Sequence, residues 1–285
     1  MLYQYRQKLF SMLDTPLGRP ILALLGSLYR TVAFRHPAFV WCDNGQWVHK
    51  EADGFMVERQ IMLHPIRHFH ALTTDFFMYS YRVLPGDVVI DCGAFTGWET
   101  LLFSKQVGPT GRVIAIEAHP VSFACLTEMC RRNHLTNVVP LHCAVSDTGG
   151  TAYILDSNSC QANSIVAGGE GIAVPTRTID EITKELGIER IDLIKMNIEG
   201  AETAALRGAP ETLRITRHVA VSCHDFLADE GGPARLRTKA DVRSLLEEIG
   251  FKITTRSDEP GREIKHYLYA DRELVQTSTA ANSNE

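Results

Sequence analysis

The sequence lacks the short motifs that would define a metal centre. It has seven cysteines and eleven histidines, but no Cys-x-x-Cys pair and no His-Glu-x-x-His. The cluster His64, His68 and His70 follows no ligand spacing, so we expect no metal site. The cysteines are odd in number, and several fall within expected strands or helices. They indicate reduced, buried thiols and a cytoplasmic protein.

Long apolar runs and an excess of positive charge are also missing. The most apolar stretch, 21–29, is too short to cross a bilayer, which takes about 20 residues. The first residues lack the basic start, apolar core and small-residue cleavage site of a signal peptide. A net charge of −5 gives no support to non-specific nucleic-acid binding.

One stretch, 88–103, carries the strongest signal. An apolar strand ends in Asp91, Gly93 and Gly97 follow, and an expected helix begins at Trp98. This strand–turn–helix pattern is typical of a doubly wound sheet. The middle glycine of a dinucleotide fingerprint and the Gly-Lys-Ser/Thr of a P-loop are both absent. An acid at the strand end would repel phosphate, but it suits a ligand with a cationic end, such as S-adenosylmethionine.

A second acid supports an adenosine ligand. Glu117 ends the next apolar strand, 26 residues after Asp91, where a carboxylate can accept both hydrogen bonds of a ribose diol. NAD enzymes use the same device, so Glu117 by itself does not separate the two cofactors. Together with the Asp-x-Gly-Ala-x-x-Gly turn, it favours S-adenosylmethionine.

These motifs resemble those of the FkbM-type methyltransferases from about Leu84 to about Ala270. The matching segments are 91–97, 116–120, 144–147 and 195–202. The last is usually Lys-x-Asp-x-Glu-Gly-Ala-Glu, and this sequence departs from it at Asn197, which removes a negative charge. The resemblance implies a class I methyltransferase fold, S-adenosyl-L-methionine as cofactor, and a small-molecule hydroxyl acceptor such as a sugar or secondary metabolite.

Strands and helices alternate from Leu84 onward. The pattern predicts an α/β fold with a doubly wound, mostly parallel seven-stranded sheet. Strands are expected at 88–91, 112–117, 138–143, 191–197, 218–222, 251–256 and 265–270, and helices at 98–106, 122–133, 179–186, 203–208 and 239–249.

The chain is expected to divide into an extension, 1–80, a methyltransferase domain, 81–272, and a disordered tail, 273–285. In the extension, apolar residues at helical spacing flank Pro16 and Pro20. Residues 39–57 are expected to form a small β segment, in which an Asn-Gly turn predicts a hairpin of 39–42 with 46–49. Helix packing, oligomerisation, a substrate lid and peripheral membrane contact all remain open for it. The segment 151–176 is expected to be an insertion, a strand pair with a mobile loop.

Candidate catalytic groups lie where parallel strands end, because ligands bind at that edge of an open sheet. His224 follows the fifth strand and is our first candidate for a general base, although it could merely bond a loop. Alternation places Asn197 and Glu199 on one side of the fourth strand's end. Glu199 could be a base, a metal ligand or a structural acceptor, whereas Asn197 can only hydrogen-bond. The candidate cofactor-binding residues are Asp91, Gly93, Ala94, Phe95, Thr96, Gly97, Glu117, Ala118, Ala144, Val145, Asp147 and Asn197.

We therefore predict an S-adenosylmethionine-dependent methyltransferase that methylates a small-molecule hydroxyl, and a homo-oligomer could form through the extension. N-methylation of a peptide or small-molecule amine is the nearest alternative. An NAD-linked oxidoreductase and a non-catalytic cofactor-binding scaffold remain open as well. No Asn/Asp-Pro-Pro-Tyr/Phe run follows the fourth strand, which argues against a nucleic-acid base as acceptor.

Overall fold

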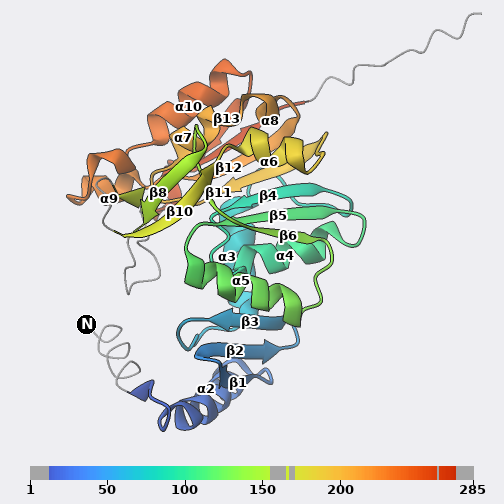
Figure 1. The fold of residues 1–285 in the computed structure, drawn as a ribbon, viewed down its shortest axis with the longest axis vertical. Coiled ribbons are helices and arrows are strands. Elements are labelled where there is room, and N and C mark those ends of the chain that lie inside the picture. The colour runs from blue at the N-terminus through green and yellow to red at the C-terminus, as the bar shows by residue number, and fades with distance from the viewer. Residues whose placement is uncertain (1–12, 155–164, 167–170, 262, 274–285) are drawn as a thin grey trace, which may run out of the picture.

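A computed structural model gives the fold and describes residues 13–154, 165–166, 171–261 and 263–273. Its centre is a seven-stranded sheet in the order β13-β14-β12-β11-β4-β5-β6 (Figure 1). Only β14 runs antiparallel to its neighbours, β12 and β13. The predicted doubly wound, mostly parallel sheet is therefore confirmed. The strands are β4 (Val88–Cys92), β5 (Arg112–Glu117), β6 (Val138–His142), β11 (Ile191–Met196), β12 (Thr216–Ser222), β13 (Lys252–Thr255) and β14 (Tyr267–Asp271).

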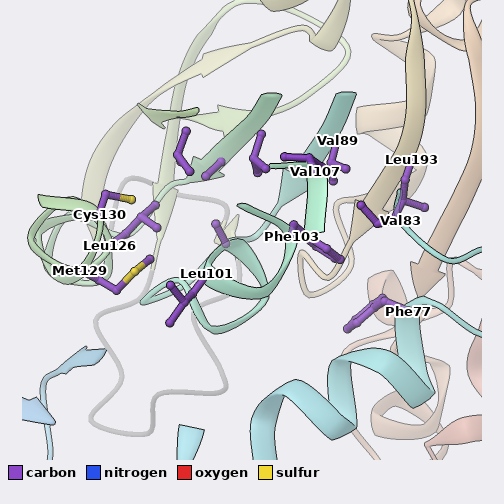
Figure 2. Packing of buried hydrophobic residues seen from close by; sticks show 14 of the residues in the cluster. Phe77, Val83, Val89, Leu101, Phe103, Val107, Leu126, Met129, Cys130 and Leu193 are labelled. Carbon is purple, nitrogen blue, oxygen red and sulfur yellow. The ribbon is translucent and has the colours of Figure 1, made fainter. Parts of the chain in front are cut away.

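Helices cover both faces of this sheet because its buried strands send alternate side chains to opposite sides. Val89 and Leu193 belong to one apolar cluster (Figure 2), and their chain neighbours Ile90 and Ile194 belong to the other. The first cluster packs against α3 (Ile66–Phe77), α4 (Trp98–Val107) and α5 (Pro120–Arg132). The second packs against α6 (Ile179–Glu185), α7 (Glu202–Arg207), α8 (Pro210–Arg214) and α10 (Lys239–Glu248).

The N-terminal part forms a helix, α2 (Arg19–Phe34), and an antiparallel sheet of β1 (Phe39–Asp43), β2 (Gln46–Glu51) and β3 (Gly54–Glu58). The predicted hairpin is confirmed, with positive φ angles at its Asn-Gly turn. The third strand lies at the end of the predicted β segment, 39–57, but was not predicted as a separate strand. Met56, Val57 and Phe77 join the same cluster as Val89, so part of the first 80 residues packs on the central sheet.

The insertion contains the expected strand pair. β8 (Gly150–Ile154) pairs antiparallel with β10 (Ile172–Arg177). They form a small sheet with β7 (Ala144–Val145) and β9 (Ile165–Val166). The expected loop within 158–171 lies largely outside the described residues, as does the tail from 274. The short helix α9 (Asp225–Asp229) and the 3-10 turns Ala234–Leu236 and Ile264–His266 complete the described elements.

Candidate active site

The turn between β4 and α4 is shaped by two glycines. Gly93 and Gly97 have φ angles of 76° and 99°, which L side chains rarely adopt. A Cβ at Gly93 would lie 2.1 Å from the carbonyl oxygen of Asn197, and one at Gly97 would lie 2.2 Å from Cε of Met129. The sequence interpretation was that these glycines admit a ligand. In the structure, the absence of a side chain at these glycines also lets the end of β11 and helix α5 pack closely against the turn.

A cavity of about 260 Å³ opens beside this turn, at the carboxyl ends of β4, β5 and β11. Its volume lies just below the roughly 300 Å³ at which small-molecule sites begin. Three of the described lining residues are acids, and none is Lys or Arg. The cavity therefore suits a ligand that carries positive charge. Its lining includes eight of the predicted site residues: Gly93, Phe95, Glu117, Ala118, Ala144, Val145, Asn197 and Glu199.

Glu117 stands in the cavity wall in a fixed orientation. Its Oε1 accepts a hydrogen bond from the amide of His119 (2.8 Å), and its Oε2 accepts one from the amide of Phe95 (2.8 Å). The side chain is buried, and burial raises the pKa of its carboxyl, which the two amides oppose. Each oxygen keeps a second acceptor site. The carboxylate can therefore still accept the two hydroxyls of a ribose.

Asp91 lies behind the cavity, outside its described lining. Its carboxylate accepts a hydrogen bond from Thr100 Oγ1 (2.7 Å) and lies 2.9 Å from the ammonium of Lys195, its register partner on β11. Both Asp91 and Lys195 are fully buried. In the structure the charge of Asp91 is therefore balanced by Lys195, and a direct contact with a ligand in the cavity stays a prediction.

A different acid, Glu99, takes the position expected of Asp91. It lies in the first turn of α4 and lines the cavity. Burial raises the pKa of its carboxyl, and the charge of Lys195 opposes this. The sequence analysis missed Glu99, although an acid two residues after Gly97 was a usable signal. Lys195 was missed in the same way: a lysine inside an apolar strand needs a buried partner.

Asn197 brings an unused acceptor to the cavity. Its amide donates to the carbonyl of Cys92 (3.1 Å), which joins the ends of β11 and β4. Its side-chain Oδ1 is buried and has no hydrogen-bond partner. Because a buried acceptor left unpaired costs roughly 1–3 kcal/mol, this atom is placed to receive a donor from a ligand.

His224 is held between two carboxylates. Its Nε2 lies 3.3 Å from Oε1 of Glu199, and its Nδ1 lies 3.4 Å from Oε1 of Glu202. Burial alone would lower the pKa of His224, but the two acids outweigh it and raise that pKa to about 10. The imidazole is therefore a cation at neutral pH. A protonated ring cannot accept a proton, which argues against the predicted role of His224 as a general base.

Glu199, in contrast, lines the cavity directly. Its backbone adopts a φ of 52°, a left-handed conformation that is uncommon for a residue with a side chain. Glu202, the other carboxylate beside His224, is itself fixed in place. It accepts hydrogen bonds from the amide of Gly200 (3.1 Å) and from Thr238 Oγ1 (2.9 Å). Of the two predicted base candidates, Glu199 is the one that faces the ligand space.

The N-terminal sheet reaches the same turn through Glu58, the last residue of β3. Its Oε1 accepts hydrogen bonds from Thr96 Oγ1 (2.7 Å) and from the indole of Trp98. Burial raises the pKa of Glu58 to about 8, although both hydrogen bonds oppose the shift. Phe69 of α3 packs on Trp98, with ring centroids 3.8 Å apart. Because β3 was not predicted as a separate strand, no sequence signal pointed to Glu58.

The remaining predicted residues lie outside the described lining of the cavity. Ala94, Thr96 and Gly97 are buried within the turn and shape it, and Asp147 accepts a hydrogen bond from Ser146 at the surface. Within the described ranges, no group of three or more His, Cys, Asp or Glu side chains is placed to hold a metal ion.

Residues 91–253 match the sequence pattern of the methyltransferase FkbM domain. The chain belongs to the FkbM methyltransferase family. It is 29% identical to the 2-O-methyltransferase NoeI of Sinorhizobium fredii over 52% of this chain and 67% of that protein. It is 25% identical to the 31-O-demethyl-FK506 methyltransferase FkbM of Streptomyces tacrolimicus over 64% of this chain and 79% of that protein. The family confirms the resemblance drawn from the motifs and makes this chain a methyltransferase.

Among solved structures, a methyltransferase FkbM from Methylobacillus flagellatus is similar over 73% of this chain, with 20% sequence identity and a TM-score of 0.49. This chain spans about half, 51%, of that protein's length.

Proposed function

We propose that this FkbM-family methyltransferase uses S-adenosylmethionine and methylates a hydroxyl group of a small molecule. The observation that carries the proposal is the cavity itself, which combines three carboxylates with the unpartnered Oδ1 of Asn197. Glu117 would accept the ribose hydroxyls, and Glu99 with Asn197 would receive the ammonium group. The buried backbone of Ala144 and Val145 would border the adenine. When bound, S-adenosylmethionine supplies a methyl group on a sulfonium, which leaves as a neutral thioether.

Glu199 is the group we assign to the acceptor. Its carboxylate would take the proton of the acceptor hydroxyl as the new carbon–oxygen bond forms and the carbon–sulfur bond breaks. A general base at this position would contribute roughly 10²–10⁴-fold to the rate. His224 is a positioning residue, because its two N–H groups face Glu199 and Glu202 and hold the former against the cavity.

The charge of the cavity supports oxygen over nitrogen as the acceptor atom. Carboxylates near an amine stabilise its protonated form, and an ammonium has no lone pair with which to attack. A hydroxyl is neutral at the same pH, and it becomes a better nucleophile when a nearby base takes its proton. NoeI and the Streptomyces enzyme are both named for methylation at oxygen, which supports the same choice for this chain.

The test is transfer of a labelled methyl group from S-adenosylmethionine to matched small molecules, each a polyol and its amino counterpart. We expect label on the hydroxyl member. Glu199→Gln should lower kcat by roughly 10²–10⁴-fold without changing the affinity for S-adenosylhomocysteine. The matched control Glu189→Gln, at an exposed acid distant in the fold from the cavity lining, should change neither quantity. Label on the amine alone would establish N-methylation, and full activity of Glu199→Gln would remove it as the base.

We also propose the division into an extension, 1–80, and a catalytic unit, 81–272, with the extension serving the assembly or placement of the enzyme. Its contact with the glycine turn through Glu58 supports a close link between the two. Among the described residues, every helix is too short or too polar to span a bilayer.

A further inference from the structure

Helix α2 turns an apolar face away from the protein. Leu17, just before the helix, is 89% exposed, Leu24 is 70% exposed and Val32 is 67% exposed. Such side chains are normally among the most buried. At 100° per residue, the exposed apolar positions within the helix fall in one arc of about 100°, as a continuous stripe. We call this stripe the outer face: Leu17, Ile21, Leu24, Leu25, Leu28 and Val32.

The inner face of α2 combines an apolar contact, Leu22 packed with Val40 and Trp47, with several polar ones. Arg30 is fully buried and binds the carboxylate of Glu51 and the ring of His49. Ser27 Oγ accepts a hydrogen bond from the amide of Val40 (2.8 Å), and Thr31 Oγ1 accepts one from the amide of Ala38 (3.1 Å).

This polar anchoring fixes which side of α2 points outward. Rotating the helix to hide its leucines would carry Arg30 out to solvent and leave the buried carboxylate of Glu51 without its cation, at a cost of about 3–5 kcal/mol. The outer face is therefore a stable property of the fold. Figure 1 shows α2 at one end of the molecule, beyond the N-terminal sheet, where an extended surface could reach it.

The charge around the outer face is positive. Within the described part, 13–42, three arginines stand against a single acid, Asp14, and one of the three, Arg30, is buried against Glu51. Asp14 is paired with Arg19. Arg35 is exposed at the C-terminal end of α2, and Arg67, exposed at the start of α3, donates to the carbonyl of Phe34 (2.6 Å).

We propose that the outer face of α2 docks on the surface of an anionic lipid bilayer. An apolar helical face beside cations is the combination that binds the boundary between headgroups and acyl chains. A second copy of the chain fits the charges less well. A two-fold contact would bring the same cationic flanks together, whereas anionic headgroups would neutralise them.

The test is co-sedimentation of the full chain with phosphatidylcholine vesicles that contain phosphatidylserine, and with vesicles of phosphatidylcholine alone. We expect binding to the anionic vesicles that is stronger than binding to the neutral ones. Leu24→Ser/Leu28→Ser should reduce binding to both, while the control Leu84→Ser, an exposed leucine outside α2, should not. Arg35→Gln should weaken binding to anionic vesicles about fivefold, and the control Lys252→Gln, at an exposed lysine of β13, should not.

The same variants identify the result that overturns the proposal. Sedimentation velocity of the free chain reports its oligomeric state. A wild-type dimer that Leu24→Ser/Leu28→Ser converts into a monomer, together with no binding to either vesicle, would assign the outer face to a second copy. Equal binding of all variants to anionic vesicles would place the lipid contact elsewhere. Because these side chains are exposed, the substitutions should leave the unfolding transition unchanged, which urea titration checks.

Discussion

Glu58 should make the protein less stable as the pH rises. Its folded-state pKa is about 8, against 4.5 for an ordinary glutamate, because burial disfavours the carboxylate. Below pH 4.5 the carboxyl is protonated in both the folded and the unfolded state. Between pH 4.5 and 8 the unfolded state has released the proton while the folded state keeps it, so the free energy of unfolding falls across this window.

The substitution Glu58→Gln isolates this contribution. Glutamine keeps an oxygen that can accept from Thr96 and Trp98, but it carries no charge. At about 1.36 kcal/mol for each unit of pKa, the shift corresponds to a difference of about 5 kcal/mol. The variant should match wild type near pH 4.5 and exceed its free energy of unfolding by that amount at pH 9.

The assay is urea-induced unfolding of wild type and variant at a series of pH values. The difference between the two curves cancels the contribution of other groups, such as His224. The exposed control Glu189→Gln should follow wild type at every pH. Parallel curves for wild type and Glu58→Gln would refute the reasoning, because they would mean that Glu58 titrates alike in both states.

Three further substitutions test the site. Asp91→Ala should lower the free energy of unfolding by about 3–5 kcal/mol in urea titration, since it removes the carboxylate that pairs with the buried ammonium of Lys195; a loss below about 1 kcal/mol would show that the pair is not structural. Glu117→Ala should weaken calorimetric binding of S-adenosylhomocysteine about 10- to 100-fold, and unchanged affinity would exclude the ribose contact. Gly97→Ala should reduce thermal stability, because its φ of 99° and its contact with Met129 leave no room for a Cβ; an unchanged melting temperature would contradict this.

Much of the central sheet could be predicted because its strands are short apolar runs with clear turns between them. The glycine turn and Glu117 were found because they sit where such strands end. β3 was not predicted as a separate strand because Gly54–Glu58 is brief and shows no strict alternation, and Glu58 was missed with it. The sequence could not show that Lys195 neutralises Asp91, since the two meet only when β4 and β11 pair.

The protonation state of His224 could not be predicted from the sequence either. Its position after the fifth strand was predicted, and an isolated histidine there would have the pKa of a general base. Its charge depends on Glu199, which reaches it through a left-handed backbone, and on Glu202, which begins the next helix. Neither contact follows from spacing along the chain. The sequence therefore predicted His224 and Glu199 as candidates at the same edge of the sheet, but it could not show that the two side chains face each other.

The central claim is that the cavity beside the glycine turn binds S-adenosylmethionine, and calorimetric titration tests it most directly. The purified chain is titrated with S-adenosylhomocysteine and, separately, with NADH. The account predicts micromolar or tighter binding of S-adenosylhomocysteine, at least about −8 kcal/mol, and no binding of NADH. Binding of NADH with no response to S-adenosylhomocysteine would contradict it.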